Sequence, residues 1–216
     1  MKMTLKPKKT EHHDNTPVEH TEHFKIVVVL DESGSMNNIK NDMKNSLNSL
    51  IEEQKQVKNK PCNFTLVKFN NNVTRVINNI DIQEVSLLTD EDYVPDGTTA
   101  LYDAVGDTMN WFRYERDVLL VVVTDGQNNA SRFYKKEQIM NMLKEKEDYA
   151  NWTFVYLGCD LQTATQGSNM GFRTSKNASN CTVVQESYCQ FISDDLNTAV
   201  KNYRKCGMSV QSQLNK

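Results

Sequence analysis

Two runs of aliphatic residues constrain the fold of this chain most strongly. Residues 26–30 read IVVVL and residues 118–123 read VLLVVV, and a polar loop with aspartate follows each run. A continuously apolar run of this length is typical of a strand buried on both faces, because a half-exposed strand alternates apolar and polar residues. Two such strands predict a sheet that helices cover on both sides.

Helical and strand-like patterns alternate along the rest of the chain. Apolar residues recur every three or four positions in four stretches, so we expect amphipathic helices at residues 39–51, 101–112, 134–149 and 187–206. Asn37 or Asn38 is expected to cap the first of them. Strands are expected at residues 24–30, 63–69, 73–77, 118–123, 152–157 and 181–184, with Asn70, Asn71 and Asn72 turning a hairpin. The order predicts a doubly wound α/β fold whose mostly parallel sheet has one antiparallel edge hairpin strand and helices on both faces.

Length and composition favour a single domain. The chain has 216 residues, of which 38% are hydrophobic and 25% charged, as in globular proteins. Residues 1–23 contain few large apolar groups, so we expect a flexible tail there, a domain at residues 24–206 and a short tail at 207–216. All four histidines lie in the first tail, at spacings that match no established zinc pattern. Trp111 and Trp152 have apolar neighbours and are expected in the core.

Charge and cysteine content limit the classes of partner and the compartment. A net charge of −3 provides no field that would recruit nucleic acid or an anionic membrane. The apolar runs are far shorter than the ~20 residues of a membrane span, and no secretory signal is recognisable. Five cysteines without a CxxC pair indicate reduced thiols. We therefore expect a cytoplasmic protein.

Oxygen-bearing side chains follow the two buried strands. In an extended stretch alternate residues point the same way, so Asp31, Ser33 and Ser35 present three oxygens to one side. Asp125 ends the second buried strand, and Thr98 precedes the helix that leads to it. The carboxyl ends of parallel strands share one edge of the sheet, where ligands bind in folds of this class. Five hard oxygen donors at this edge suggest a hard divalent cation.

The same motifs resemble a known family. The residues Asp31-x-Ser33-x-Ser35, Gly97-Thr98 and Thr124-Asp125-Gly126 are similar to those of the von Willebrand factor type A domain, over residues 24–206. In that family they build the metal-ion-dependent adhesion site (MIDAS), so the resemblance implies Mg²⁺ or Mn²⁺ held by Asp31, Ser33, Ser35, Thr98 and Asp125. Residues 93–101 and 152–158 look like those of small stand-alone bacterial and phage members, whereas Cys159-Asp160-Leu161 departs from their Asn-Gln-Asp run.

The resemblance implies a protein-binding module and not an enzyme. An Asp or Glu side chain of a partner protein would complete the coordination of the ion, in the assembly of an intracellular complex. The alternatives are a metal-assisted phosphoryl or ester hydrolase, or the binding subunit of an ATPase-linked complex. A hydrolase is disfavoured because no nucleophile elbow, phosphate-binding loop or histidine base occurs in residues 24–206.

Several questions stay open at the level of sequence. Gln127, Asn128, Asn129 and Ser131 either contact a partner or close the loop before the next helix. The run Asp90-Glu91-Asp92 is a solvated acidic run or a second ion site, and the first interpretation is favoured. The oligomeric state and a possible sliding of the last helix are left undetermined.

Overall fold

A central sheet of six strands organises the structure, a computed structural model that describes residues 23–149, 151–158, 161–172, 181–184 and 188–214. The strand order within these residues is β3-β2-β1-β4-β5-β6, and only β3 runs antiparallel to its neighbour. The strands are β1 (Phe24–Asp31), β2 (Cys62–Phe69), β3 (Val73–Asp81), β4 (Val118–Thr124), β5 (Thr153–Gly158) and β6 (Cys181–Val184). This confirms the expected mostly parallel sheet with one antiparallel edge strand.

The two apolar runs lie side by side as β1 and β4 in the middle of the sheet. Successive side chains of β1 point into two different cores: Ile26, Val28 and Leu30 into one, Val27 and Val29 into the other. Every residue of both strands is buried. Because both faces are covered, neither strand has room for alternating polar residues, which explains the unbroken apolar sequences.

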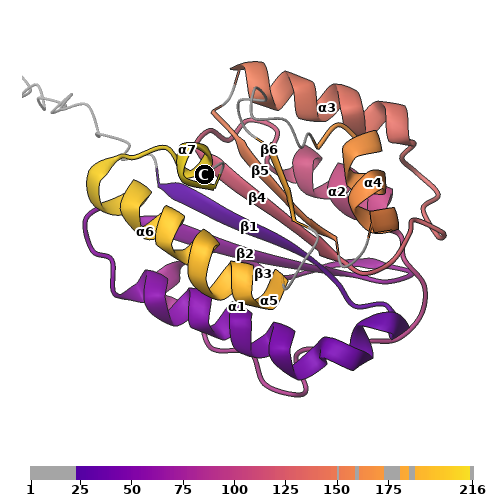
Figure 1. Cartoon of the computed structure of the whole chain (residues 1–216), viewed down its shortest axis with the longest axis horizontal. Helices are drawn as coiled ribbons and strands as arrows, with labels where there is room; N and C mark the ends of the chain where they lie inside the picture. The colour runs from indigo at the N-terminus through magenta and orange to yellow at the C-terminus, as the bar shows by residue number, and fades with distance from the viewer. Residues whose placement is uncertain (1–22, 150, 159–160, 173–180, 185–187, 215–216) are drawn as a thin grey trace, which may run out of the picture.

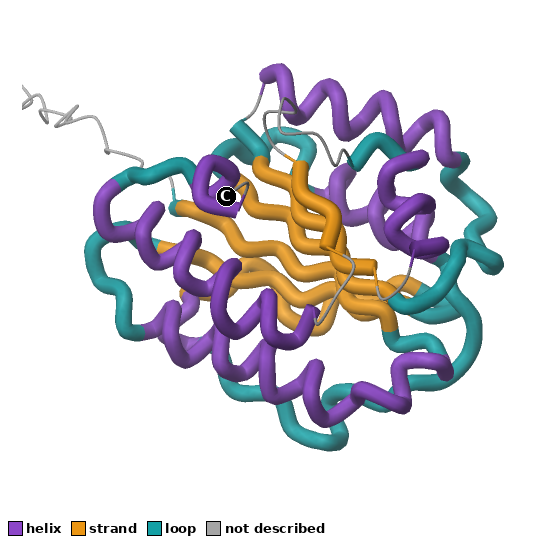
Figure 2. Tube along the Cα trace, in the orientation of Figure 1, coloured by secondary structure: helices purple, strands orange, loops and turns teal. Residues whose placement is uncertain are grey.

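Helices cover both faces of the sheet (Figures 1 and 2). The face that we call the α1 side carries α1 (Lys40–Lys55), α5 (Tyr188–Phe191), α6 (Asn197–Cys206) and α7 (Val210–Leu214). The opposite α2 side carries α2 (Leu101–Trp111), α3 (Lys136–Tyr149) and α4 (Leu161–Asn169). None of the described helices is both long enough and apolar enough to cross a membrane.

The start of the first helix differs from the expectation. Gly34–Ile39 forms a 3-10 helix before α1 begins, and neither Asn37 nor Asn38 caps it through its side chain. Asn37 instead donates from Nδ2 to the carbonyl oxygens of Gly34 and Pro95, both at 3.1 Å. The cap prediction was wrong because the side chain bridges to a loop that lies far away in sequence.

The last helix is also less regular than predicted. A π-helical segment at Ile192–Leu196 separates α5 from α6, and a left-handed Gly207 (φ 72°) ends α6. Residues 207–216, expected as a tail, include α7, whose Val210 is buried in the α1-side core. Neither α7 nor α4 was expected from the sequence. Of the other proposed tail, residues 1–23, only His23 belongs to the described residues, and its Nδ1 lies 2.8 Å from Asn63 Oδ1.

The two tryptophans differ in burial. Trp152 is fully buried, as expected, whereas Trp111 is 37% exposed and the core assignment was wrong for it. The Arg75 guanidinium of β3 lies 4.6 Å from the Trp111 ring centroid. Trp111 thus packs against Arg75 of the outer strand while part of its side chain remains exposed to solvent.

Candidate metal centre

Asp31 is the deepest of the predicted site residues. It ends β1 and is fully buried. Its Oδ1 accepts a hydrogen bond from the backbone N–H of Ser33 at 2.7 Å, and its Oδ2 accepts one from the Thr124 hydroxyl at 2.6 Å. The Tyr93 hydroxyl, also buried, donates to the Asp31 carbonyl at 2.8 Å. Both carboxylate oxygens are therefore held in one orientation.

A series of side-chain oxygens extends from this carboxylate towards the surface. The Ser33 and Ser35 hydroxyl oxygens lie 3.2 Å apart, and the Ser35 hydroxyl donates to Asp125 Oδ1 at 2.6 Å. Ser33 is buried, Asp125 is half-buried and Ser35 is exposed. The structure thus brings together Asp31, Ser33, Ser35 and Asp125 from the ends of β1 and β4.

Backbone hydrogen bonds place Thr98 at this edge of the sheet. Gly34 N–H donates to the carbonyl oxygen of Gly97 at 3.2 Å, and Thr98 N–H donates to Asn71 Oδ1 at 2.9 Å. Gly97 has a φ of 80°, and a Cβ there would lie 2.1 Å from Asn71 Oδ1, so this close approach requires glycine. The exposed Thr98 consequently sits next to the loop that carries Ser33 and Ser35.

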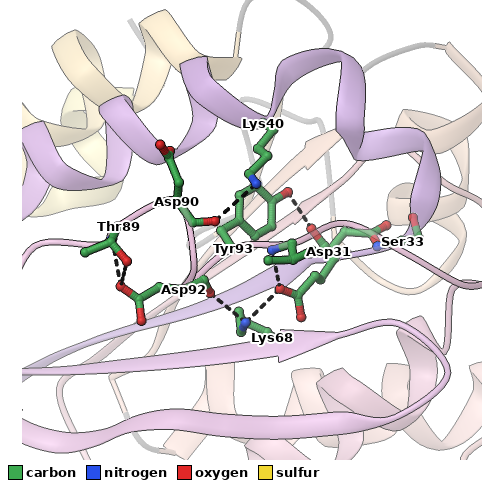
Figure 3. A network of polar contacts seen from close by, with 10 residues as sticks. Asp31, Ser33, Lys40, Lys68, Thr89, Asp90, Asp92 and Tyr93 are labelled. Atoms are coloured by element: carbon green, nitrogen blue, oxygen red, sulfur yellow. Dashed lines mark hydrogen bonds and ion pairs between the residues drawn. The ribbon is translucent and has the colours of Figure 1, made fainter.

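Glu32 attaches the same loop to the neighbouring strand (Figure 3). Its Oε1 pairs with the Lys68 ammonium at 2.7 Å and accepts from Val94 N–H at 2.9 Å. Its carbonyl oxygen accepts from Asp96 N–H at 2.8 Å. Sequence reasoning missed Glu32, Tyr93 and Asn71, because each acts through a partner that is distant in sequence.

The electrostatics of the site favour a cation. Burial raises the pKa of the Asp31 carboxyl from 3.8 to about 6, although the hydrogen bonds from Thr124 and Ser33 act in the opposite direction. The negative charge of Asp125 raises this pKa further. Two neighbouring carboxylates with serine hydroxyls between them are the donor set that suits a hard divalent cation, so the residues present fit such an ion.

We expect the stability of the metal-free protein to fall as the pH rises from about 4 to 6. The pKa of Asp31 is higher in the folded state (about 6) than in the unfolded state (3.8), so its contribution is fully present below pH 3.8 and is lost as the pH passes 6. The shift corresponds to about 3 kcal/mol of unfolding free energy. Urea unfolding in EDTA at several pH values measures it, and Asp31→Asn should remove this part of the pH dependence. Equal slopes for both proteins would contradict the assignment.

The residues that follow Asp125 close a loop. Asn129 Oδ1 accepts from Thr99 N–H at 2.8 Å, and Asn128 Oδ1 accepts from Tyr102 N–H at 3.3 Å. In return the buried Asp103 accepts from the N–H groups of Arg132, Phe133 and Tyr134, at 2.7 to 2.9 Å. These contacts match the capped-loop alternative, since the amide oxygens satisfy N–H groups at the start of α2.

The acidic run at residues 90–92 has internal partners. The Lys44 ammonium pairs with Asp90, and Asp92 Oδ2 accepts from both the N–H and the hydroxyl of Thr89 at 2.7 Å. No group of three or more His, Cys, Asp or Glu side chains placed to hold a metal occurs in the described part of the chain. The favoured interpretation, a solvated acidic run, agrees with these contacts.

Fold, motif order and site geometry converge on one family. The sequence model of the von Willebrand factor type A domain matches residues 25–199, from β1 into α6. The chain belongs to this family. No curated protein matches the sequence.

Several solved structures share this fold. Proximal thread matrix protein 1 from the mussel byssus has a TM-score of 0.54 and 20% identity, over 85% of this chain and 47% of that one. The manganese-loaded TRAP protein of Plasmodium vivax has 0.55 and 18%, over 80% and 72%. The PilB minor pilin of Streptococcus sanguinis has 0.63 and 13%, over 92% and 63%. The chain spans about half the length of the mussel protein, and at these identities the likeness concerns the fold.

Proposed function

We propose that this von Willebrand factor type A domain is a protein-binding module that depends on a divalent metal ion. The observation that carries the proposal is the hydrogen-bonded series from Asp31 through Ser33 and Ser35 to Asp125. It is supported by two solved structures of the same fold, a mussel protein described with a zinc-occupied MIDAS motif and the manganese-loaded Plasmodium protein. The ion that this chain prefers depends on its own ligating residues and not on those of the two similar proteins.

Asp31, Ser33, Ser35, Thr98 and Asp125 would hold the ion. The two carboxylates supply the negative charge, while the hydroxyls supply neutral oxygens, a set that favours Mg²⁺ or Mn²⁺ over softer metals. The bound ion would offer an electrophilic position to a carboxylate oxygen. Because Ser35 and Thr98 are exposed, a partner can reach the site from solvent.

The partner is proposed to be a protein that presents an Asp or Glu side chain, within an intracellular complex. A hydrolase would also require a nucleophile or a general base beside the metal. The side-chain oxygens of Asn128 and Asn129 accept from N–H groups at and just before the start of α2, and Ser131 accepts from Asp103 N–H and donates to Asn128. Asn128 N–H also donates to Gln166 of α4. These rim residues are thus engaged within the domain, which supports a binding role for the site rather than catalysis.

A metal-dependent pull-down tests this function. We expect a partner to be retained from the producing cells by the wild-type protein in Mg²⁺, but neither in EDTA nor by Ser35→Ala. Asp90→Ala is the matched control, since Asp90 is an exposed carboxylate that pairs with Lys44 outside the site. Retention of the same proteins in all four conditions would show that no metal bridge is involved.

A further inference from the structure

A groove outside the metal centre runs beneath the outer strand β3 and is closed on its other side by residues 84–92. Its volume is about 370 Å³. Three apolar side chains in its lining are substantially exposed, namely Val76 (44%), Ile80 (38%) and Leu87 (40%). Together these three side chains give the groove an apolar wall that the described residues leave open to solvent.

The polar part of the lining is acidic. Glu84, Glu91 and Asp92 contribute three carboxylates, against the single ammonium of Lys68. That ammonium pairs with Glu32 at 2.7 Å and donates to the Asp92 carbonyl at 2.6 Å (Figure 3). An occupant that matches this lining therefore combines apolar side chains with positive charges.

The first nine residues of the chain have this composition. They read MKMTLKPKK, with Met1, Met3 and Leu5 at alternate positions, four lysines and no acidic residue. In an extended peptide, alternate side chains point to the same side, so three apolar groups can face one surface.

The chain enters the fold beside the groove. His23 Nδ1 lies 2.8 Å from Asn63 Oδ1, and Asn63 Nδ2 donates to the carbonyl oxygen of Asn79 at 3.3 Å. Asn79 precedes Ile80, one of the residues that line the groove. Residues 10–22 can span up to about 40 Å when extended, which is ample for a return to this place.

We propose that residues 1–9 occupy this groove of the same molecule. Met3 and Leu5 contact Val76, Ile80 and Leu87, and the lysines lie against Glu84 and Glu91. The occupant covers apolar surface that the described residues leave exposed. It also lies next to Lys68, whose ammonium pairs with Glu32, the residue between Asp31 and Ser33.

A charge exchange in the full-length protein tests the proposal. Amide hydrogen exchange across residues 76–88 is measured in EDTA, so that the result does not depend on the proposed metal site. Changing Lys2, Lys6, Lys8 and Lys9 to Glu should accelerate this exchange about tenfold, as expected for the loss of several exposed ion pairs. Glu84→Lys with Glu91→Lys should do the same. Combining both sets should restore the wild-type rate.

Two further variants sharpen the result. Met3→Ser with Leu5→Ser should also accelerate exchange, because the apolar contacts are lost while the charges remain. Lys135→Glu with Lys144→Glu, exposed positions before and within α3 on the α2 side, should leave it unchanged. Neither variant changes a residue of the two described core clusters, so unfolding should not obscure the comparison.

Three outcomes would overturn the proposal. The first is wild-type exchange in both charge variants, and the second is acceleration in both without restoration in the combined protein. The third is a dimer, seen by light scattering, that dissociates in the Lys-to-Glu variant. This last result would assign the groove to the segment of a second copy.

Discussion

Asp31→Ala should lower the affinity for Mg²⁺ or Mn²⁺ by more than about 100-fold, because even outer-shell partners of metal ligands are worth about 10 to 100-fold. Asp31 is the fully buried carboxylate of the site, and hydrogen bonds from Ser33 and Thr124 orient its two oxygens. No other carboxylate in the loop between β1 and α1 can replace it, since Glu32 is paired with Lys68. Isothermal titration calorimetry or Mn²⁺ electron paramagnetic resonance at pH 7.5 measures the loss.

The controls separate a metal ligand from a structural residue. Asp90→Ala removes an exposed carboxylate and should keep the wild-type affinity. Ser35→Ala removes one exposed hydroxyl, so it should weaken binding without affecting the fold. Unchanged metal affinity in both Asp31→Ala and Ser35→Ala would place the ion elsewhere on the protein.

Arg204→Met should reduce the free energy of unfolding by about 4 kcal/mol, since it leaves several buried carbonyl oxygens without a donor. Arg204 is 3% exposed and lies in α6. Its guanidinium donates to the carbonyl oxygens of Gln54 at 2.6 Å, Val57 at 2.8 Å and Lys60 at 2.9 Å. These oxygens lie at and just beyond the carboxyl end of α1. A positive charge there also interacts favourably with the negative end of the helix dipole.

Urea denaturation measures this effect. Lys205→Met, at the exposed neighbouring position of α6, is the matched control and should change stability by less than about 0.5 kcal/mol. A loss in Arg204→Met no larger than in Lys205→Met would mean that the guanidinium does not anchor the helix. Metal titration of the same two variants tests whether α6 regulates metal affinity. Only Arg204→Met removes the hydrogen bonds that join α6 to the end of α1.

The motif predictions show which site residues could be predicted from the local sequence. Asp31, Ser33 and Ser35 could be grouped from an extended stretch of five residues after a buried strand, and Asp125 from the end of a second one. The structure places these four within a continuous set of hydrogen bonds, while their role as ligands stays a prediction. Thr124 was part of the recognised motif, but the sequence carries no sign that its hydroxyl would bind Asp31.

Errors arose where a side chain has a distant partner. Asn37 or Asn38 was expected to cap the helix that follows, yet Asn37 bonds to Pro95, which lies 58 residues further along the chain. Trp111 was placed in the core from its apolar neighbours, but it is the last residue of α2, is partly exposed and lies against Arg75. The helices α4 and α7 are short, so they carry too few apolar repeats for a helical period to stand out.

The sequence by itself determined the fold class, the burial of β1 and β4 on both faces and the edge of the sheet where oxygen donors gather. These follow from apolar periodicity and from the loops that end each strand, which are local properties of the chain. Only the tertiary structure decided how Asp31 is oriented, how α6 is anchored by Arg204 and where an acidic groove opens beneath β3. Each of these depends on contacts between residues far apart in sequence, and such contacts exist only after the sheet and its helices have packed together.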